Sequence, residues 1–276
     1  MPLVINTNIA SLEAQKNLAN SQGVLQKSFQ RLSSGYRINS ASDDAAGLGV
    51  SESLKARIRS FSVAERNTTN ALNMSRTAES GLGEVSGIVI RMRELAVQSA
   101  NGDLSSTDRG YIDTEFGLMK EEIDRLANST KFNSIDLLGG VATTIAFQVG
   151  ISTTSSDTIS VSFGAISASS LGLSGVSVAG SSATNSTAAI TALDSALTQV
   201  STNRARFGAA ANRLSIAVTS SQTIRTNLEA ANSSIRDVDV AEETSLLSRS
   251  QVLLQAGTSV LSQANQAPQL ALSLLR

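Results

Sequence analysis

The sequence contains no cysteine, no histidine and no tryptophan. The absence of cysteine excludes disulfides, thiolate metal sites and cysteine nucleophiles. The absence of histidine removes the commonest general base and the commonest metal ligand. Aromatic residues make up only 3% of the 276 residues, whereas 41% are hydrophobic. The apolar residues are therefore mainly Ala, Leu, Ile and Val, which suit thin seams between helices better than a thick globular core.

The sequence also has few prolines, almost no net charge and no long apolar run. The only prolines are Pro2 and Pro268, so nothing between them forces a helix to break. No run of about 18 apolar residues occurs and no basic segment precedes an apolar stretch at the start, so we expect neither membrane insertion nor a Sec signal peptide. The formal net charge is −1. The chain therefore has no overall positive electrostatic potential that would attract it to nucleic acid or an anionic membrane.

Most of the sequence has the apolar spacing of amphipathic helices. Residues 4–33 and 44–100 predict two such helices, and the second would run roughly 80 Å at 1.5 Å per residue. A shorter helix is expected from Ile112 to Leu126. From Ile190 onward, apolar residues recur at seven-residue intervals in two columns, which favours coiled-coil packing. The first column contains Leu193, Val200, Phe207 and Leu214.

The helical stretches are separated by segments of different character. Residues 33–47, SSGYRINSASDDAAG, predict a break, with Ser42 or Asp43 as the N-cap of the next helix. Apolar and polar residues alternate at 145–149 and 159–163, which predicts a β-hairpin within about 140–175. The Ser/Gly/Ala-rich segment that follows is either loop or weak strand. We therefore expect a mainly α fold: a long antiparallel helical coiled-coil bundle with a small β-hairpin region between its N- and C-terminal halves.

Both ends of the chain carry apolar stripes with nearly seven-residue spacing. At the C-terminal end the apolar residues form adjacent pairs, which we call the doublets: Leu246–Leu247, Leu253–Leu254 and Val260–Leu261. Neighbouring residues in a helix point about 100° apart, so these doublets make a wide stripe. Either the two end helices pair within one molecule, or neighbouring molecules cover them; the width favours intermolecular packing and hence a self-assembling protein. The candidate assembly residues are Ile5, Ile9, Leu12, Leu18, Leu25 and Leu32, with Leu246, Leu247, Leu253, Leu254, Val260 and Leu261.

No constellation for catalysis or cofactor binding is found in the sequence. Asp43–Asp44 and Glu121–Glu122 are sequence neighbours that do not share a helix face, so we interpret them as capping or solvated charges. The GLG glycines at 47–49 and 81–83 do not follow a strand and match no phosphate-binding pattern. The basic stretch KARIR at 55–59 is isolated and is interpreted as a solvated helix face. We expect no enzyme, no cofactor and no metal.

Several long motifs, in order, resemble bacterial flagellin, and together they cover residues 5–140 and 190–276. They are INTNIASLEAQKNL, QRLSSGYRINSASDDAAG (30–47), IRMRELAVQSANG (90–102), EEIDRLANSTKFNSIDLL (121–138), NRARFGAAANRL (203–214) and LLQAGTSVLSQANQAPQLALSLLR (253–276).

The resemblance implies a structural subunit of the bacterial flagellar filament, which is extracellular and drives motility. It implies an inner coiled-coil domain of residues 1–42 with 237–276, and a helical rod domain of residues 43–236. Only about 45–50 residues separate the helical blocks, too few for a further domain of typical size, so the chain looks like a minimal flagellin without outer domains.

The same resemblance implies the partners. The chain would be exported unfolded through the flagellar type III apparatus, with an export chaperone on the C-terminal helix. It would then polymerise at the filament tip, where the filament cap and hook-junction proteins act. Arg91, Leu95 and Glu115 match the patch recognised by the flagellin-sensing Toll-like receptor, although Ile90 replaces the usual Gln. Leu95 also fits the apolar stripe of its own helix, so a packing role stays open.

Three alternatives remain at the level of sequence. A hook–filament junction protein shares the plan of a terminal coiled coil. A secreted enzyme with flagellin-like ends would need a large insert and catalytic residues that the chain lacks. An intracellular coiled-coil scaffold would not need stripes on both ends or the motif at 30–47. The full-length match favours the filament subunit.

Overall fold

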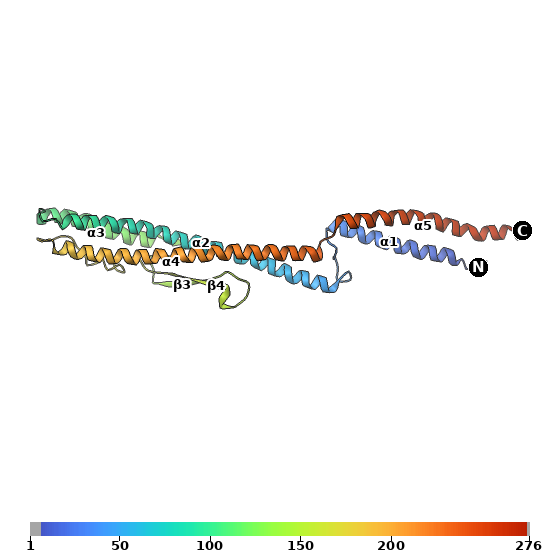
Figure 1. The fold of residues 1–276 in the computed structure, drawn as a ribbon, viewed down its shortest axis with the longest axis horizontal. Coiled ribbons are helices and arrows are strands. Elements are labelled where there is room, and N and C mark those ends of the chain that lie inside the picture. Colours follow the sequence, from blue (N-terminus) through green and yellow to red (C-terminus); the bar gives the residue numbers. More distant parts are fainter. Residues whose placement is uncertain (1–6, 275–276) are drawn as a thin grey trace. The chain divides into compact units, whose positions relative to one another are not determined.

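The computed structural model describes the backbone of residues 7–274 and the side chains of residues 7–266 (Figure 1). The strands form two antiparallel pairs, β1 (Lys131–Phe132) with β2 (Ile135–Asp136) and β3 (Thr143–Gln148) with β4 (Thr158–Phe163). The predicted mainly α fold with a small β-hairpin between two helical halves is confirmed. Its helices are α1 (Ile9–Ser34), α2 (Ala45–Ser99), α3 (Ser106–Ser129), α4 (Thr184–Arg236) and α5 (Val240–Leu274).

Internal contacts divide the chain into two compact units. Unit 1 consists of residues 1–58 and 226–276, and unit 2 consists of residues 59–225. The helices α2 and α4 contribute to both units. This division rests on contacts alone, and the functional division of the sequence at residues 42 and 237 stays a prediction.

In unit 2, α2, α3 and α4 pack as an antiparallel bundle. Ion pairs fix the direction of α4 against α2, because Glu79 pairs with Arg204 at 2.8 Å and Arg93 with Asp194 at 2.7 Å. Rising residue numbers on α2 thus meet falling numbers on α4. The shared core is made of aliphatic side chains at helical spacing with two phenylalanines: Leu82, Val85, Val89, Met92, Phe116, Ile123, Leu193, Val200, Phe207 and Leu214. The α4 residues in this list, Leu193, Val200, Phe207 and Leu214, belong to the first seven-residue column of the sequence, and all four are buried.

The β3–β4 hairpin packs against the bundle through one face. Alternation along β4 buries Ile159, Val161 and Phe163, as its sequence pattern predicts. The Phe163 ring lies 5.4 Å from the Phe207 ring of α4, centroid to centroid. The hairpin therefore extends the hydrophobic core of unit 2 instead of standing free in solvent.

Residues 164–183, which we call the strap, connect β4 to α4 without regular secondary structure and run along α3. Side chains of α3 hold its backbone: Asp113 accepts from the Val178 N–H, Lys120 donates to the Val176 carbonyl, and Asp124 accepts from the Ala168 N–H, each at 2.8 Å. Apolar strap residues are buried beneath these bonds: Ile166, Ala168, Leu171, Leu173 and Val178. The segment that the sequence leaves between loop and weak strand is therefore an ordered, buried connection.

In unit 1, the break between α1 and α2 begins at a glycine. Gly35 has φ 75°, a left-handed conformation that glycine adopts without strain, and its N–H donates to the Arg31 carbonyl at the end of α1. The carboxylate of Asp44 accepts from the Gly47 N–H at 2.8 Å and so caps α2. The prediction of Ser42 or Asp43 as this N-cap is wrong, because Asp43 instead accepts from the Ser40 hydroxyl and N–H.

Candidate assembly surface

The two end helices pair with one another in unit 1. They run antiparallel, since the Asn8 amide donates to the Ala264 carbonyl at 2.7 Å while Arg31 pairs with Glu243 at 3.4 Å. The Asn8 side chain also caps α1 by accepting from the Ser11 N–H. At the start of α5, the Asp239 carboxylate accepts from the Ala241 N–H at 2.9 Å. Both paired helices therefore begin at a side-chain cap.

The seam between α1 and α5 alternates leucines with small residues. Small side chains let two helices approach closely, and Cα atoms of the pair come within 8 Å of each other. At Gly257 a β-carbon would lie only 2.9 Å from the Leu18 Cδ1, so the glycine makes room for that leucine. Partly or fully buried seam residues are Ser11, Leu18, Leu25, Ser28 and Leu32 on α1, and Leu247, Ser250, Leu254, Gly257 and Leu261 on α5.

Each C-terminal doublet is divided between the seam and the outer face. The second members, Leu247, Leu254 and Leu261, are half-buried against α1. The first members are exposed at 38% for Leu246, 48% for Leu253 and 53% for Val260. We call these three the outer stripe. It repeats every seven residues, which is the spacing that a partner helix can follow.

The α1 candidates divide in the same way. Leu18, Leu25 and Leu32 lie in the seam, whereas Ile9 and Leu12 are exposed on the outer face. Ile5 lies outside the described residues. Sequence reasoning missed the small seam residues. Ser250 and Gly257 could have been found by their own seven-residue spacing, and Ser11 by its place seven residues before Leu18.

Charged residues connect the end of α1 to the start of α5. Glu243 is buried and pairs with Arg31, so a carboxylate and a guanidinium neutralise each other within the seam. Beyond it, the Arg236 guanidinium lies 4.6 Å from the centroid of the Tyr36 ring. The Arg37 N–H donates to the Arg236 carbonyl at 2.7 Å. The two connections, from α1 to α2 and from α4 to α5, are thus tied to each other.

The three receptor candidates do not share one environment. Arg91 pairs with Glu94 at 2.9 Å and with Glu115 of α3 at 3.1 Å. The hydrogen bonds that its guanidinium donates to the two carboxylates, with the bond to Glu94 the larger cause, raise the pKa of Arg91. This cluster is exposed. Leu95, in contrast, is only 2% exposed and belongs to the core of unit 2. Ile90, beside Arg91, is 47% exposed.

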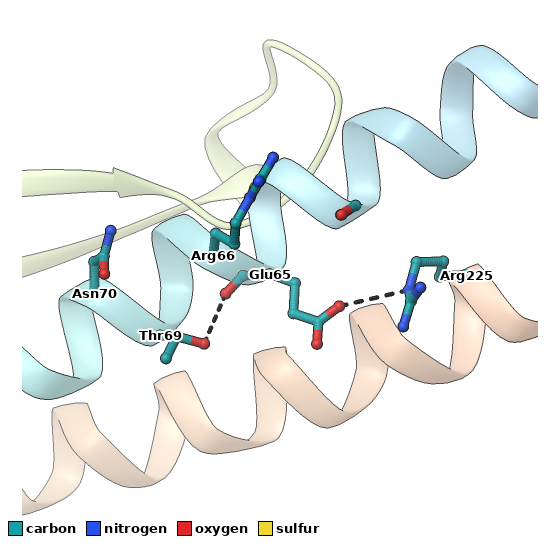
Figure 2. A pocket seen from close by; sticks show the side chains of 6 residues that line it. Glu65, Arg66, Thr69, Asn70 and Arg225 are labelled. Atoms are coloured by element: carbon teal, nitrogen blue, oxygen red, sulfur yellow. Dashed lines mark hydrogen bonds and ion pairs between the residues drawn. The ribbon is translucent and has the colours of Figure 1, made fainter.

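A hollow of unit 2 between α2 and α4 has a volume of about 410 Å³ and is polar (Figure 2). Its one carboxylate, Glu65, faces Arg225 at 3.5 Å, and the Thr69 hydroxyl donates to the Glu65 backbone carbonyl. The carboxylate is therefore paired with a cation, and Glu65 is the only acid among the described residues that line the hollow. Nothing in this hollow resembles the paired groups of an acid–base site.

The remaining charged candidates are capping or solvated residues. Glu122 is paired with Arg125 on the surface of α3, which lowers the pKa of Glu122. Lys55 of the basic stretch lies 3.7 Å from Glu52. The side chains that the structure describes include no cluster of three or more acidic, histidine or cysteine residues able to hold a metal ion. Within residues 7–274, no helix is long and apolar enough to cross a membrane.

The ends of the chain match two family profiles. The bacterial flagellin N-terminal helical region matches residues 5–143, and the bacterial flagellin C-terminal helical region matches residues 190–275. The chain is 39% identical over 274 residues to a flagellin of Halalkalibacterium halodurans, covering 99% of this chain and 100% of the relative. It is 39% identical over 290 residues to the flagellar filament 33 kDa core protein of Treponema phagedenis, with 99% and 100% covered.

Solved structures give a weaker likeness. A putative flagellar hook-associated protein from Vibrio parahaemolyticus superposes with a TM-score of 0.59 over 71% of this chain and 100% of its own, at 15% identity. At that identity the likeness shows the fold alone. A flagellin from Bacillus cereus is 32% identical over 60% of this chain and 94% of its own, with a TM-score of 0.48.

Proposed function

Because the chain belongs to the bacterial flagellin family, we propose that its outer stripe is a surface through which one subunit binds the next. The chain is a structural subunit of the extracellular flagellar filament and assembles with copies of itself. Flagellin is a family of structural proteins, so the chain is not an enzyme.

The division of the C-terminal doublets is the observation that supports this surface. Pairing of α1 with α5 covers Leu247, Leu254 and Leu261 but leaves Leu246 and Leu253 in solvent. A regular row of exposed apolar side chains is stabilised when a second apolar surface covers it and removes it from water. Neighbouring copies present the same row, and their packing would bury it. Within one molecule the end helices therefore pair, and between molecules the outer stripe packs.

We propose the functional domains and further partners on the same basis. Residues 1–42 with 237–276 form the inner coiled-coil domain, and residues 43–236 form the rod domain. Before export through the flagellar type III apparatus, a chaperone covers the outer stripe on α5. The filament cap and the hook-junction proteins meet the subunit at the two ends of the filament. Each of these partners would shield apolar residues that α1 leaves exposed.

Seeded assembly of the full-length chain beside a fragment of residues 43–236 tests the proposed role of the ends. Both proteins are added to short filament seeds at neutral pH, and growth is followed by pelleting and electron microscopy. We expect long tubes from the full-length chain and none from the fragment, because the fragment lacks both end helices. Growth of the fragment at the same rate would show that the ends are not the assembly element.

We further propose that the exposed cluster of Arg91 and Glu115 is recognised by the flagellin-sensing Toll-like receptor. Its support is the matching motif and the exposure of this ion pair. Leu95 would act by holding α2 in place, because it is buried.

Replacement of both charged residues by alanine should reduce receptor activation without loss of assembly. The matched control is alanine at Glu122 and Arg125, another exposed ion pair of unit 2. Unchanged activation by the Arg91 and Glu115 variant, or an equal loss in the control, would contradict recognition at this cluster.

A further inference from the structure

The turn between α2 and α3 contains the only Asn-Gly pair in the sequence, Asn101–Gly102. Asn101 is exposed and lies just beyond Ser99, the last residue of α2. A hollow of about 610 Å³, lined in part by Gln98, Asn101 and Asp103, adjoins it. The Asn101 side chain is therefore open to water.

No hydrogen bond holds the two reacting groups of this pair. Among the described residues, neither the Asn101 side-chain amide nor the Gly102 N–H has a hydrogen-bond partner. Gly102 has no β-carbon to obstruct approach of its nitrogen to the Asn101 Cγ. Asn39–Ser40 is different: the Asn39 amide donates to the Ser34 hydroxyl at 2.8 Å, and the Ser40 N–H donates to Asp43 at 3.1 Å.

A buried arginine faces the backbone of the same asparagine. Arg109 is 3% exposed, and its guanidinium donates to the Ser99 carbonyl and to the Asn101 carbonyl, each at 2.8 Å. No carboxylate of the described residues lies within 4.0 Å of this guanidinium. A buried cation held only by carbonyl oxygens would be stabilised by a full negative charge at either of their positions.

We propose that Asn101 is a site of intramolecular covalent modification, at which the Asn101–Gly102 linkage rearranges to an isoaspartyl bond whose new carboxylate pairs with Arg109. In the first step the Gly102 nitrogen attacks the Asn101 Cγ. The new N–Cγ bond forms, the Cγ–Nδ2 bond breaks, and ammonia leaves with the Gly102 proton. The product is a five-membered succinimide, and no oxidant or reductant takes part.

Arg109 directs the second step. Water adds to one of the two succinimide carbonyls, and attack at the former Asn101 backbone carbonyl breaks its bond to the Gly102 nitrogen. That oxygen is the one to which Arg109 donates, so the guanidinium stabilises the negative charge that develops on it. Cleavage there leaves the chain running through the side-chain carbonyl and turns the former backbone carbonyl into a carboxylate beside Arg109. Attack at the other carbonyl would give ordinary aspartate, whose charge faces solvent.

The test compares the folded protein with the same protein in denaturant. Both are incubated at mildly alkaline pH, digested under acidic conditions, and the Asn, Asp and isoAsp forms of each asparagine peptide are quantified by chromatography and fragmentation mass spectrometry. We expect Asn101 to be lost several-fold faster than Asn39 in the folded chain. The isoAsp share at residue 101 should exceed that of the denatured chain. Persistence of Asn101 in the folded chain, or an equal isoAsp share in both states, overturns the proposal.

Two variants separate the two steps. Gly102→Ala should slow the loss of Asn101 several-fold, because a β-carbon at residue 102 obstructs attack by its nitrogen. The circular dichroism should stay unchanged, because that β-carbon would meet nothing within 4 Å in the folded chain. Arg109→Lys should keep the loss but lower the isoAsp share toward that of the denatured chain. If Arg109→Lys fails to fold, the comparison of the native chain with its denatured form still decides the role of Arg109. An unchanged rate in Gly102→Ala would contradict attack by the Gly102 nitrogen.

Discussion

The outer stripe makes a quantitative prediction for assembly. Fully burying a leucine or valine side chain contributes about 1.5–3 kcal/mol. Leu253 is 48% exposed and Val260 is 53% exposed in unit 1. A neighbour that covers both residues therefore gains about 1 kcal/mol from each, or roughly 2 kcal/mol together. The double variant Leu253→Gln, Val260→Gln should raise the critical concentration for assembly by about 30-fold, at ~1.4 kcal/mol per tenfold change.

Glutamine has a high helix propensity and replaces the branched apolar ends of both side chains by a polar amide. The control places glutamine at Ser248 and Ser262, which are exposed and lie on another face of α5. The critical concentration is read from the protein left in the supernatant after seeded growth and sedimentation. Both variants should keep the circular dichroism of the native monomer. The reasoning is refuted if the double variant assembles at the native concentration, or if the control is impaired as strongly.

Three further predictions concern unit 2. Leu214→Ala should lower the free energy of unfolding by about 2–5 kcal/mol in urea titrations, because Leu214 is fully buried; no loss would place it outside the core. Asp113→Ala should cost about 1.5–3 kcal/mol and speed hydrogen exchange in the strap, since it removes acceptors for the Ser177 hydroxyl and the Val178 N–H; unchanged exchange would contradict that anchor. The hydrogen bond from the Ser105 hydroxyl is the largest cause that lowers the pKa of Asp108, so the Asp108 carboxylate stabilises unit 2 above its unfolded-state pKa, and this stability is lost as the pH falls through its folded-state pKa. In acid titrations, Ser105→Ala should therefore lose less of its free energy of unfolding than the native chain. Identical losses in the two proteins would contradict the cap.

The helices and the hairpin could be predicted because their patterns are local. The absence of internal proline and the spacing of apolar residues predict α2 at 44–100, and the structure places it at Ala45–Ser99. Alternation at 159–163 predicts β4, which the structure places at Thr158–Phe163. The N-cap of α2 was predicted one or two residues too early, because Asp43 and Asp44 are both good caps and only their hydrogen bonds distinguish them.

The strap and the division of the doublets depend on contacts far apart in the sequence. Ile166 and Leu173 follow no period, and their burial depends on α3 side chains that bind the strap backbone. The doublets predict a wide stripe, but which member faces α1 is decided by where Ser250 and Gly257 allow close approach. The receptor motif likewise does not reveal that Leu95 is buried while Arg91 is exposed.

Thiol accessibility tests the central account most directly, since the chain has no cysteine of its own. Single cysteines are placed at Leu253, in the outer stripe, and at Gln255, an exposed position outside it. Each variant is reacted with a maleimide as monomer and as filament. The account predicts that both monomers react and that Leu253→Cys is protected in the filament more strongly than Gln255→Cys. A Leu253→Cys that reacts as fast in filaments as in monomers would contradict packing of the outer stripe between subunits.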